Sequence, residues 1–363
     1  MIFCSECFKD SQLKEIIRSR KIRGECTSCG CKNAYIYDIL KDEYLDGFLD
    51  ELINIYTPKK NLPKDYPSSD LHMLADELKN EWNIFNENLS SSTIHSIAKS
   101  ISPRLYKEHP ELFEEPIGIK EKYDKEELYE LSMLKDKKWS DFVESIKHKN
   151  RFHTQIIDLK KLETYLSYLR KNYPKGTKMY RGRLCSGSEG YDKKSMGAPP
   201  VKTAKEGRAN SVGIRRLYVA DCEKTCIHEI RAGAFDTVSI GTFKSKEDLA
   251  VIDFKQINTF SPFSSEDFNY LEYLINKPIL KKIDEEMSKN VKGNDNTLDY
   301  IPTQFLCDFI ATMEYKDGEN FQGVEYSSTL YPAGYNLAIF DPELFNCTGV
   351  KTYNISKLEY DYR

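Results

Sequence analysis

The N-terminal part of the chain repeats apolar side chains at three- and four-residue intervals, the spacing of a helix with one buried face. Residues 38–56, DILKDEYLDGFLDELINIY, show it most clearly, and a turn-rich stretch, NLPKDYPSSD, follows them. Three further segments have helical patterns, and they are residues 71–85, 93–101 and 125–148. The pattern therefore predicts a mainly helical domain over residues 41–148.

From about residue 150 the pattern changes to short apolar runs separated by turns. A helix predicted over residues 160–171 precedes them. The runs are rich in Tyr, Val and Ile and are bounded by Gly, Pro, Asn or Asp, which is typical of strands. They are KMYRGRL, RRLYVAD, AVIDF, GVEYSS and YNLAIF, and helices are expected between them at about 222–233, 265–290 and 303–314. Residues 149–363 are thus expected to form a mixed domain, and the fold class is α+β.

Five of the ten cysteines lie within the first 31 residues. Cys4 and Cys7 form one CxxC turn, and Cys26 and Cys29 form a second one eighteen residues later. Two such turns are a four-thiolate zinc pattern, and four protein ligands leave no position for a catalytic water. We expect a structural zinc knuckle over residues 1–40, with Cys31 as an alternative to Cys29 for the fourth ligand.

Composition and charge narrow the class of protein. The 363 residues include 53 basic and 57 acidic side chains, so the net charge of −4 does not indicate attraction of the whole molecule to nucleic acid. No apolar run approaches the roughly 18–20 residues of a membrane span, and no leader pattern opens the chain. We expect a cytoplasmic protein with reduced thiols and no membrane partner.

Common catalytic motifs are absent from the sequence. It contains no GxGxxG after a predicted strand, no GxxxxGK[ST], no HExxH and no GxSxG. What remains is a set of polar residues at strand ends. MYRGR places Arg181 at the end of a predicted strand, and Asp221 ends LYVAD, where it is expected to cap a helix that carries His228 and Glu229. Adjacent helical side chains diverge by about 100°, so His228 and Glu229 make a poor joint metal site.

Three blocks of the C-terminal half resemble the RES domain, a family named for its Arg, Glu and Ser and found as toxins of bacterial toxin–antitoxin systems. The first block is MYRGR, with the family arginine at Arg181. The second is GRANSVGIRRLYVADCEKTCIHEI, with the glutamate at Glu229. The third is YIPTQFLCDFI with GVEYSSTLYPAGYNLAIF, whose register on Tyr326 and Asn336 selects Ser328 over Ser327 as the serine.

The resemblance covers about residues 151–342, and KNRFH at 149–153 looks like its opening segment. One departure is Cys226, where the family usually has alanine. The N-terminal region is similar to the HEPN-like domain that precedes some RES domains, although this likeness is looser.

The resemblance implies a fold similar to ADP-ribosyltransferase toxins and an enzyme that consumes NAD⁺, as a toxin or an anti-phage effector, by hydrolysis or phosphorolysis of the nicotinamide–ribose bond. NAD⁺ is then substrate and not cofactor. A carboxylate at Glu229 suits the positive charge that develops on the ribose, and the fork of Arg181 suits a pyrophosphate. Arg208 is expected to assist or to bind phosphate, and Ser328 to hydrogen-bond the substrate.

Three further residues complete the candidate site. Tyr180 and Tyr218 are placed either against a base of the substrate or in the core. Asn210 is expected to tie the backbone of a turn, with a substrate contact as the weaker role.

Other functions stay open. The same fold can transfer ADP-ribose to a macromolecule, and RLYKEH at 104–109 has the R-x4-H spacing of HEPN ribonucleases, although Pro110 interrupts the helix that such a motif needs. The expected partners are NAD⁺ and an antitoxin, or in its place control by the N-terminal domain; a nucleic-acid partner is not favoured. The oligomeric state is open.

Overall fold

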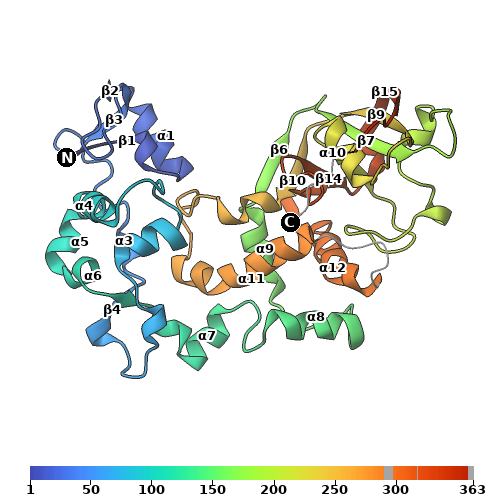
Figure 1. Ribbon diagram of the computed structural model, residues 1–363. Helices are drawn as coiled ribbons and strands as arrows, with labels where there is room; N and C mark the ends of the chain where they lie inside the picture. The colour runs from blue at the N-terminus through green and yellow to red at the C-terminus, as the bar shows by residue number, and fades with distance from the viewer. Residues whose placement is uncertain (290–296, 317, 359–363) are drawn as a thin grey trace. The chain divides into compact units, whose positions relative to one another are not determined.

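A computed structural model describes residues 1–289, 297–316 and 318–358. The chain divides into two compact units (Figure 1). Unit 1 comprises Met1–Asp136 and Asn258–Pro278, and unit 2 comprises Lys137–Ile257 and the chain from Ile279 onward. Within the described residues, no helix has the length and apolar composition that crossing a membrane requires.

Unit 1 begins with a small three-stranded sheet in the order β1-β3-β2, formed by β1 (Ile2–Cys4), β2 (Arg23–Gly24) and β3 (Ala34–Asp38). Helix α1 (Ser11–Ser19) packs against it, and the Asp10 carboxylate caps α1 by accepting from the Leu13 amide at 2.9 Å. Phe3 and Tyr37 stack in the core between them, and both are buried.

The rest of unit 1 is built from short helices, and only part of the predicted pattern is confirmed. These elements are α2 (Asp50–Ile53), α3 (Leu74–Asp76) with a π-helical turn over Glu77–Glu81, α4 (Ser91–Ile101), α5 (Pro103–Glu108), α6 (Glu111–Glu114), α7 (Lys125–Leu131) and the strand pair β4 (Thr57–Pro58) and β5 (Ile117–Gly118). The helix expected at 93–101 is present as α4. Helix α5 stops before Pro110, as expected, and leaves Arg104 and His109 both exposed.

The helix predicted over 38–56 is wrong for most of its length, because Asp38 ends β3 and only Asp50–Ile53 is helical. The Tyr37 hydroxyl accepts from the Leu45 amide and donates to the Asp42 carbonyl, which fastens a series of turns instead. Gly47 then takes a φ of 76°, outside the helical region. Leu45 and Leu49 are buried nevertheless. The spacing of the apolar residues therefore indicated which side chains are buried, and it did not indicate a helix.

Unit 2 is centred on an eight-stranded sheet in the order β15-β9-β7-β8-β14-β13-β10-β6. Its strands are β6 (Arg170–Tyr173), β7 (Lys178–Leu184), β8 (Leu217–Ala220), β9 (Thr237–Ser245), β10 (Leu249–Asp253), β13 (Gly323–Ser327), β14 (Tyr335–Ile339) and β15 (Phe345–Asn354). The β10–β13 pair is parallel, and the other pairs of this sheet are antiparallel. All five predicted strands are present, and the mixed α+β character of this half is confirmed.

Helices of unit 2 follow the sequence pattern with shifted ends. They are α8 (Trp139–His148), α9 (Leu159–Ser167), α10 (Glu223–Glu229), α11 (Tyr270–Ser288), which belongs to unit 1 up to Pro278, and α12 (Ile301–Ile310). The helix predicted over 125–148 is interrupted between α7 and α8, and the one predicted over 160–171 ends at Ser167 because β6 begins at Arg170. Helix α10 packs against β7, β8 and β9 (Figure 1).

The sheet of unit 2 has two different faces, because successive side chains of a strand point to opposite sides. Gly182 of β7 faces α10, since a Cβ there would lie 3.2 Å from the Cys226 Cβ. The opposite face carries an apolar cluster that includes Met179, Met196 and Phe243. The face under α10 positions the candidate active site.

Candidate active site and metal centre

Glu229 is the last residue of α10, and its carboxylate is held by two side chains, that of Ser328 directly after β13 and that of Asn336 in β14. Its Oε1 atom accepts from the Ser328 hydroxyl at 2.6 Å and from the Asn336 amide at 2.7 Å. Ser328 and Asn336 are buried, whereas Glu229 is exposed. Because both bonds go to Oε1, the carboxylate is fixed in orientation while its Oε2 side faces away from them.

The strand register explains why Ser328 and not Ser327 makes this contact. Ser327 pairs with Tyr335, and Tyr326 pairs with Asn336 across the β13–β14 ladder. Side chains alternate along a strand, so Tyr326, Asn336 and Ser328 share the face that α10 covers, and Ser327 points to the other face. The register chosen from the sequence therefore places the serine beside Glu229.

The loop that follows Ser328 is tied to both ends of α10. The Ser328 hydroxyl accepts from the Tyr331 amide at 3.0 Å, and the Tyr331 ring stacks on His228 at a centroid distance of 5.1 Å. At the helix start, Asp221 Oδ1 accepts from the Thr225 hydroxyl at 2.6 Å and from the Tyr335 amide at 3.3 Å. The loop and the helix are thus positioned as one assembly.

Asp221 does not cap α10 as the sequence predicted. The N-cap residue is Cys222, which makes no capping hydrogen bond through its side chain. The Asp221 side chain instead fastens Thr225 and the start of β14. The loop also approaches closely here, because a Cβ on Gly334 would lie 2.1 Å from the Thr225 hydroxyl.

The turn GRAN lies beside this assembly and is organised by Asn210 and Tyr218. The Asn210 amide donates to the carbonyls of three loop residues at 2.9–3.1 Å, which agrees with its expected role in a turn. The Tyr218 hydroxyl donates to Asn210 Oδ1 at 2.7 Å and accepts from the Ala209 amide. Burial raises the pKa of Tyr218 well above its ordinary value, so it stays a neutral donor. In this structure Tyr218 holds the turn.

Arg208, in the same turn, binds backbone carbonyls at the C-terminal end of α11. Its guanidinium donates to the carbonyls of Glu286, at 3.0 Å, Met287 and Lys289, at and after the end of α11. Its charge also lies over the Tyr326 ring, 5.4 Å from the centroid. Burial raises the pKa of Tyr326, and the positive charge of Arg208 opposes that rise.

Arg181 is not brought to Glu229. It precedes Gly182, which faces α10, so its own side chain points to the opposite face of the sheet. There its guanidinium donates to the carbonyls of Met196, at 2.6 Å, and Gly197, at 2.8 Å. Burial, and then the neighbouring charge of Arg183, lower the pKa of Arg181 to about 10. Tyr180 points toward α10 and packs beside Cys226 and Ile240.

Cys226, the departure from the family pattern, is a packing residue. It is buried under α10 against Gly182 and Ile240, and burial raises the pKa of its thiol to about 12. A protonated, enclosed thiol is a poor nucleophile.

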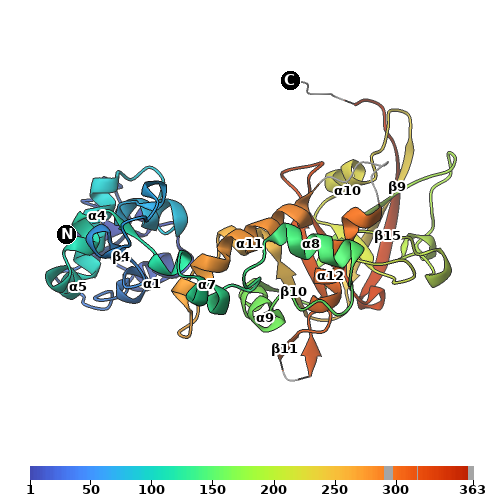
Figure 2. The same cartoon turned by 90° about the horizontal axis from the view of Figure 1, so that it is seen from below.

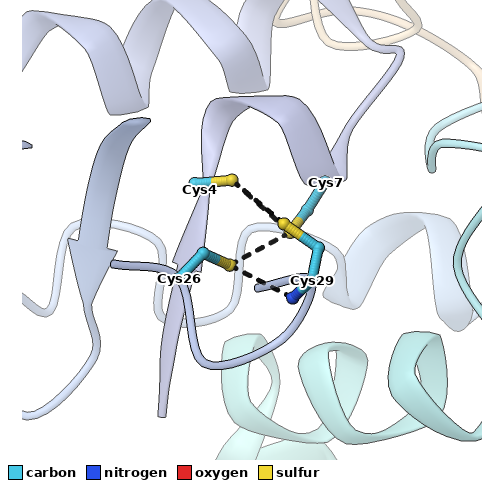
Figure 3. A group of neighbouring side chains, drawn as sticks. All are labelled: Cys4, Cys7, Cys26 and Cys29. Atoms are coloured by element: carbon cyan, nitrogen blue, oxygen red, sulfur yellow. Dashed lines mark hydrogen bonds between the residues drawn. The ribbon is translucent and has the colours of Figure 1, made fainter. Parts of the chain in front are cut away.

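The thiols of Cys4, Cys7, Cys26 and Cys29 form one group in unit 1 (Figure 3). The sulfur distances are 3.8 Å for Cys4–Cys7, 3.5 Å for Cys4–Cys29 and 3.6 Å for Cys7–Cys26. Zn–S bonds of about 2.3 Å in a tetrahedron place the sulfurs about 3.8 Å apart, so the group fits a tetrahedral metal ion. The fourth member is Cys29, and Cys31 lies outside the group of four.

Asn336 is a residue of the candidate site that sequence reasoning missed, because it entered only as a marker of register. A buried polar side chain in the apolar run YNLAIF was the available signal, since such a group needs a partner. Its partner proves to be Glu229.

A protein-family model matches the C-terminal part of the chain. Residues 183–361 match the model of the RES domain, so the match begins later and ends later than the expected 151–342 and leaves Tyr180 and Arg181 just outside. No curated protein and no solved structure matches the chain. Glu229, Ser328 and Asn336 all fall inside the matched region. The C-terminal part of the chain is a RES domain, a family associated with NAD⁺-related toxin function.

Proposed function

We propose that the protein cleaves the nicotinamide–ribose bond of NAD⁺, and that it acts as a toxin or defence effector by depleting this dinucleotide. The observation that carries the proposal is the oriented carboxylate of Glu229, held through one oxygen by Ser328 and Asn336. The other oxygen is available to a substrate. An ADP-ribosyltransferase-like fold for the domain belongs to the same proposal.

The chemistry follows from the charges in the reaction. Nicotinamide leaves with the electron pair of the broken C–N bond and becomes neutral, so positive charge develops on the ribose. A carboxylate fixed beside the anomeric carbon of the ribose stabilises this charge without having to reorient during the reaction. Water or phosphate then bonds to the same carbon and gives ADP-ribose or its phosphate ester, with a proton released from water. Ser328 orients Glu229 and is not the nucleophile.

Arg208 is proposed to bind the phosphates of the substrate, whereas Arg181, which lies on the face of the sheet opposite Glu229, would have to leave that face to take the same role. Among the described residues, the hydrogen bonds of both guanidinium groups go to neutral backbone carbonyls. Phosphate oxygens are stronger acceptors for a guanidinium than carbonyls are, so these residues would exchange partners when substrate binds. Tyr180 and Tyr218 remain proposed neighbours of the substrate, Asn210 keeps a secondary role, and Ser327 is the alternative serine.

The four thiolates of unit 1 are proposed to bind zinc. Cys4, Cys7, Cys26 and Cys29 would supply all four ligands and would hold the N-terminal sheet together, with no part in the NAD⁺ reaction.

Nicotinamide release from NAD⁺ by the purified full chain tests the proposal. We expect release by the wild type and at least about a 100-fold loss in Glu229→Gln, which keeps the shape of the side chain and removes its charge. Glu247→Gln, an exposed residue between β9 and β10, is the matched control and should keep full activity. Equal activity of Glu229→Gln and wild type would refute the role of the carboxylate. ADP-ribose as product identifies hydrolysis, its phosphate ester identifies phosphorolysis, and label transferred to protein or nucleic acid would contradict turnover of free NAD⁺.

A further inference from the structure

Tyr326 of β13 is a buried tyrosine beside the candidate active site. It is 7% exposed, and it lies on the sheet face that also carries Ser328 and Asn336. Asn336 is directly opposite Tyr326 in the β13–β14 ladder and donates to Glu229 at 2.7 Å. Helix α12 packs on β13 and beside α8 (Figure 2). Tyr326 is therefore a neighbour of the residues that hold the Glu229 carboxylate.

Three other polar side chains on this face are hydrogen-bonded within the protein. Ser328 and Asn336 both donate to Glu229. Tyr218 of β8, on the same face, donates and accepts through its hydroxyl. The Tyr326 hydroxyl, in contrast, makes no hydrogen bond to any residue that the structure describes. It is a donor that the folded chain leaves unused.

The Tyr326 hydroxyl is also partly accessible. Polar side-chain atoms that are fully enclosed and unpaired occur at several other described positions, and this hydroxyl is not among them. A buried hydroxyl without a partner costs free energy, and phenylalanine at this position would avoid that cost. The unused donor therefore indicates an acceptor that arrives with a ligand.

Two charged side chains of the candidate site influence Tyr326. Burial raises the pKa of its hydroxyl, the positive charge of Arg208 opposes the rise, and the negative charge of Glu229 adds to it. The hydroxyl is thus neutral and can donate a hydrogen bond. The Arg208 guanidinium lies over the ring, 5.4 Å from its centroid. In the proposed function Arg208 binds phosphate and Glu229 acts at the anomeric carbon, so Tyr326 neighbours the residues for both ends of one ribose phosphate unit.

We propose that the Tyr326 hydroxyl donates a hydrogen bond to a hydroxyl oxygen of the ribose that carries nicotinamide. This inference rests on the proposed function. The ribose is the part of NAD⁺ between the carbon at which Glu229 acts and the phosphates that Arg208 would bind. A phosphate is the less suitable acceptor for Tyr326, because Arg208 supplies a charged donor for it. The bond helps to fix the anomeric carbon against the free oxygen of Glu229.

Calorimetric titration of the full chain with ADP-ribose and with ADP tests the contact. Both ligands contain adenosine and two phosphates, and only ADP-ribose contains the second ribose. Tyr326→Phe removes the hydroxyl and keeps the ring. We expect this variant to bind ADP-ribose about five- to tenfold more weakly than wild type, the effect of one lost hydrogen bond, and to bind ADP with unchanged affinity. Tyr315→Phe is the matched control, because the Tyr315 hydroxyl donates to the exposed Glu319, and it should bind both ligands as wild type does.

The free energy of unfolding separates a ligand contact from a structural role. The Tyr326 hydroxyl contributes no hydrogen bond to the described chain, so Tyr326→Phe should be at least as stable as wild type in urea titrations. Tyr218→Phe is the comparison, because it loses bonds to Asn210 and to the Ala209 amide, and it should be less stable. A destabilised Tyr326→Phe that binds both ligands more weakly would make Tyr326 a structural residue and would overturn the proposal.

The titrations themselves can also overturn the proposal. Unchanged affinity of Tyr326→Phe for ADP-ribose would exclude the contact. Equal weakening for ADP-ribose and ADP would assign the hydroxyl to the phosphates and not to the ribose. Wild type that binds ADP-ribose no more tightly than ADP would show that the second ribose is not recognised.

Nicotinamide release from NAD⁺ by the same variants distinguishes this inference from the proposed function. We expect Tyr326→Phe to lower release about tenfold or more, because the bond that orients the ribose is lost. Release equal to wild type, together with loss of activity in Glu229→Gln, would leave the proposed function intact and remove Tyr326 from the site. If wild type releases no nicotinamide while its binding of ADP-ribose depends on the Tyr326 hydroxyl, the ribose contact stands and the proposed function fails.

Discussion

The thiol group of unit 1 and the carboxylate site of unit 2 are assembled in opposite ways. Cys4 and Cys29, the outermost of the four cysteines, are 25 positions apart, and two tight turns present all four sulfurs. Glu229 meets Ser328 across 99 positions and Asn336 across 107, through the pairing of β13 with β14. Spacing alone therefore reveals the first site, whereas the second depends on a strand register.

Loss of the metal is expected to have the largest effect and to show how far the N-terminal sheet depends on it. Structural zinc contributes about 10–16 kcal/mol in small zinc-binding peptides, so Cys7→Ser should unfold the β1–β3 sheet. Metal content and circular dichroism of the purified chain measure this. Cys31→Ser is the matched control, because Cys31 lies outside the group of four, and it should keep one metal per chain. Equal loss in both variants would contradict the assignment of Cys29.

A second carboxylate in unit 2, Glu325, separates stability from catalysis. It is fully buried one residue before Tyr326 and so points to the face opposite α10, where Lys171 Nζ lies 2.9 and 3.0 Å from its oxygens. Lys255 and Tyr173 donate to it as well. Removing one partner of a buried ion pair costs about 3–5 kcal/mol. Glu325→Ala should therefore lower the free energy of unfolding by that amount in urea titrations.

Glu319→Ala, an exposed glutamate of β12 (Glu319–Asn320), is the control for this measurement and should change stability little. Glu229→Gln should likewise leave the unfolding free energy nearly unchanged, since Glu229 is exposed. A large destabilisation by Glu229→Gln would mean that the carboxylate proposed to be catalytic also supports the fold.

The two donors to Glu229 are expected to act as a pair. Ser328→Ala and Asn336→Ala should each lower nicotinamide release about tenfold, the effect of one lost hydrogen bond to a charged group. Because both donate to Oε1, the double variant should lose less than the product of the two single losses. Strictly multiplicative losses would show that the two side chains serve different steps.

The sequence predicted those elements whose apolar pattern and strand propensity agree, and it missed elements held by contacts distant along the chain. Four of the five predicted strands of unit 2 contain Val or Ile, and the fifth, KMYRGRL, was predicted from its Met, Tyr and Leu. Strands β9 (TVSIGTFKS) and β15 (FNCTGVKTYN) were not predicted, because both mix polar, Gly and apolar residues. They are defined by their pairing with each other and by the pairing of β9 with β7. The segment 38–56 failed for the converse reason, since apolar spacing without helical backbone came from burial in successive turns.

The candidate active site likewise contains residues that the sequence indicated and residues whose positions depend on the fold. The resemblance to the RES domain pointed to Glu229 and Ser328, which the structure brings within hydrogen-bond distance, whereas it gave no information on where the arginines point. Gly182 faces α10, so its neighbour Arg181 lies on the opposite face of the sheet. Arg208 donates to the end of α11 because its turn lies there. The sequence showed Asn336 only as part of a motif, and the pairing of β13 with β14 places it opposite Tyr326.

The smallest expected effect is the contribution of Asp10, the cap of α1, to the pH dependence of stability. Burial raises the pKa of Asp10, although the hydrogen bond that its carboxylate accepts from the Leu13 amide opposes the rise. A carboxyl with a higher pKa in the folded state binds more protons folded than unfolded, so its contribution to stability falls as the pH rises from about 4 through the folded pKa. Asp10→Asn keeps the capping acceptor without the charge, and Asp10→Ala removes the cap at a cost of about 1 kcal/mol. In urea titrations across pH, wild type should therefore lose stability relative to Asp10→Asn over that window and remain parallel to it at higher pH. A constant difference at every pH would show that the Asp10 carboxyl has the same pKa in both states.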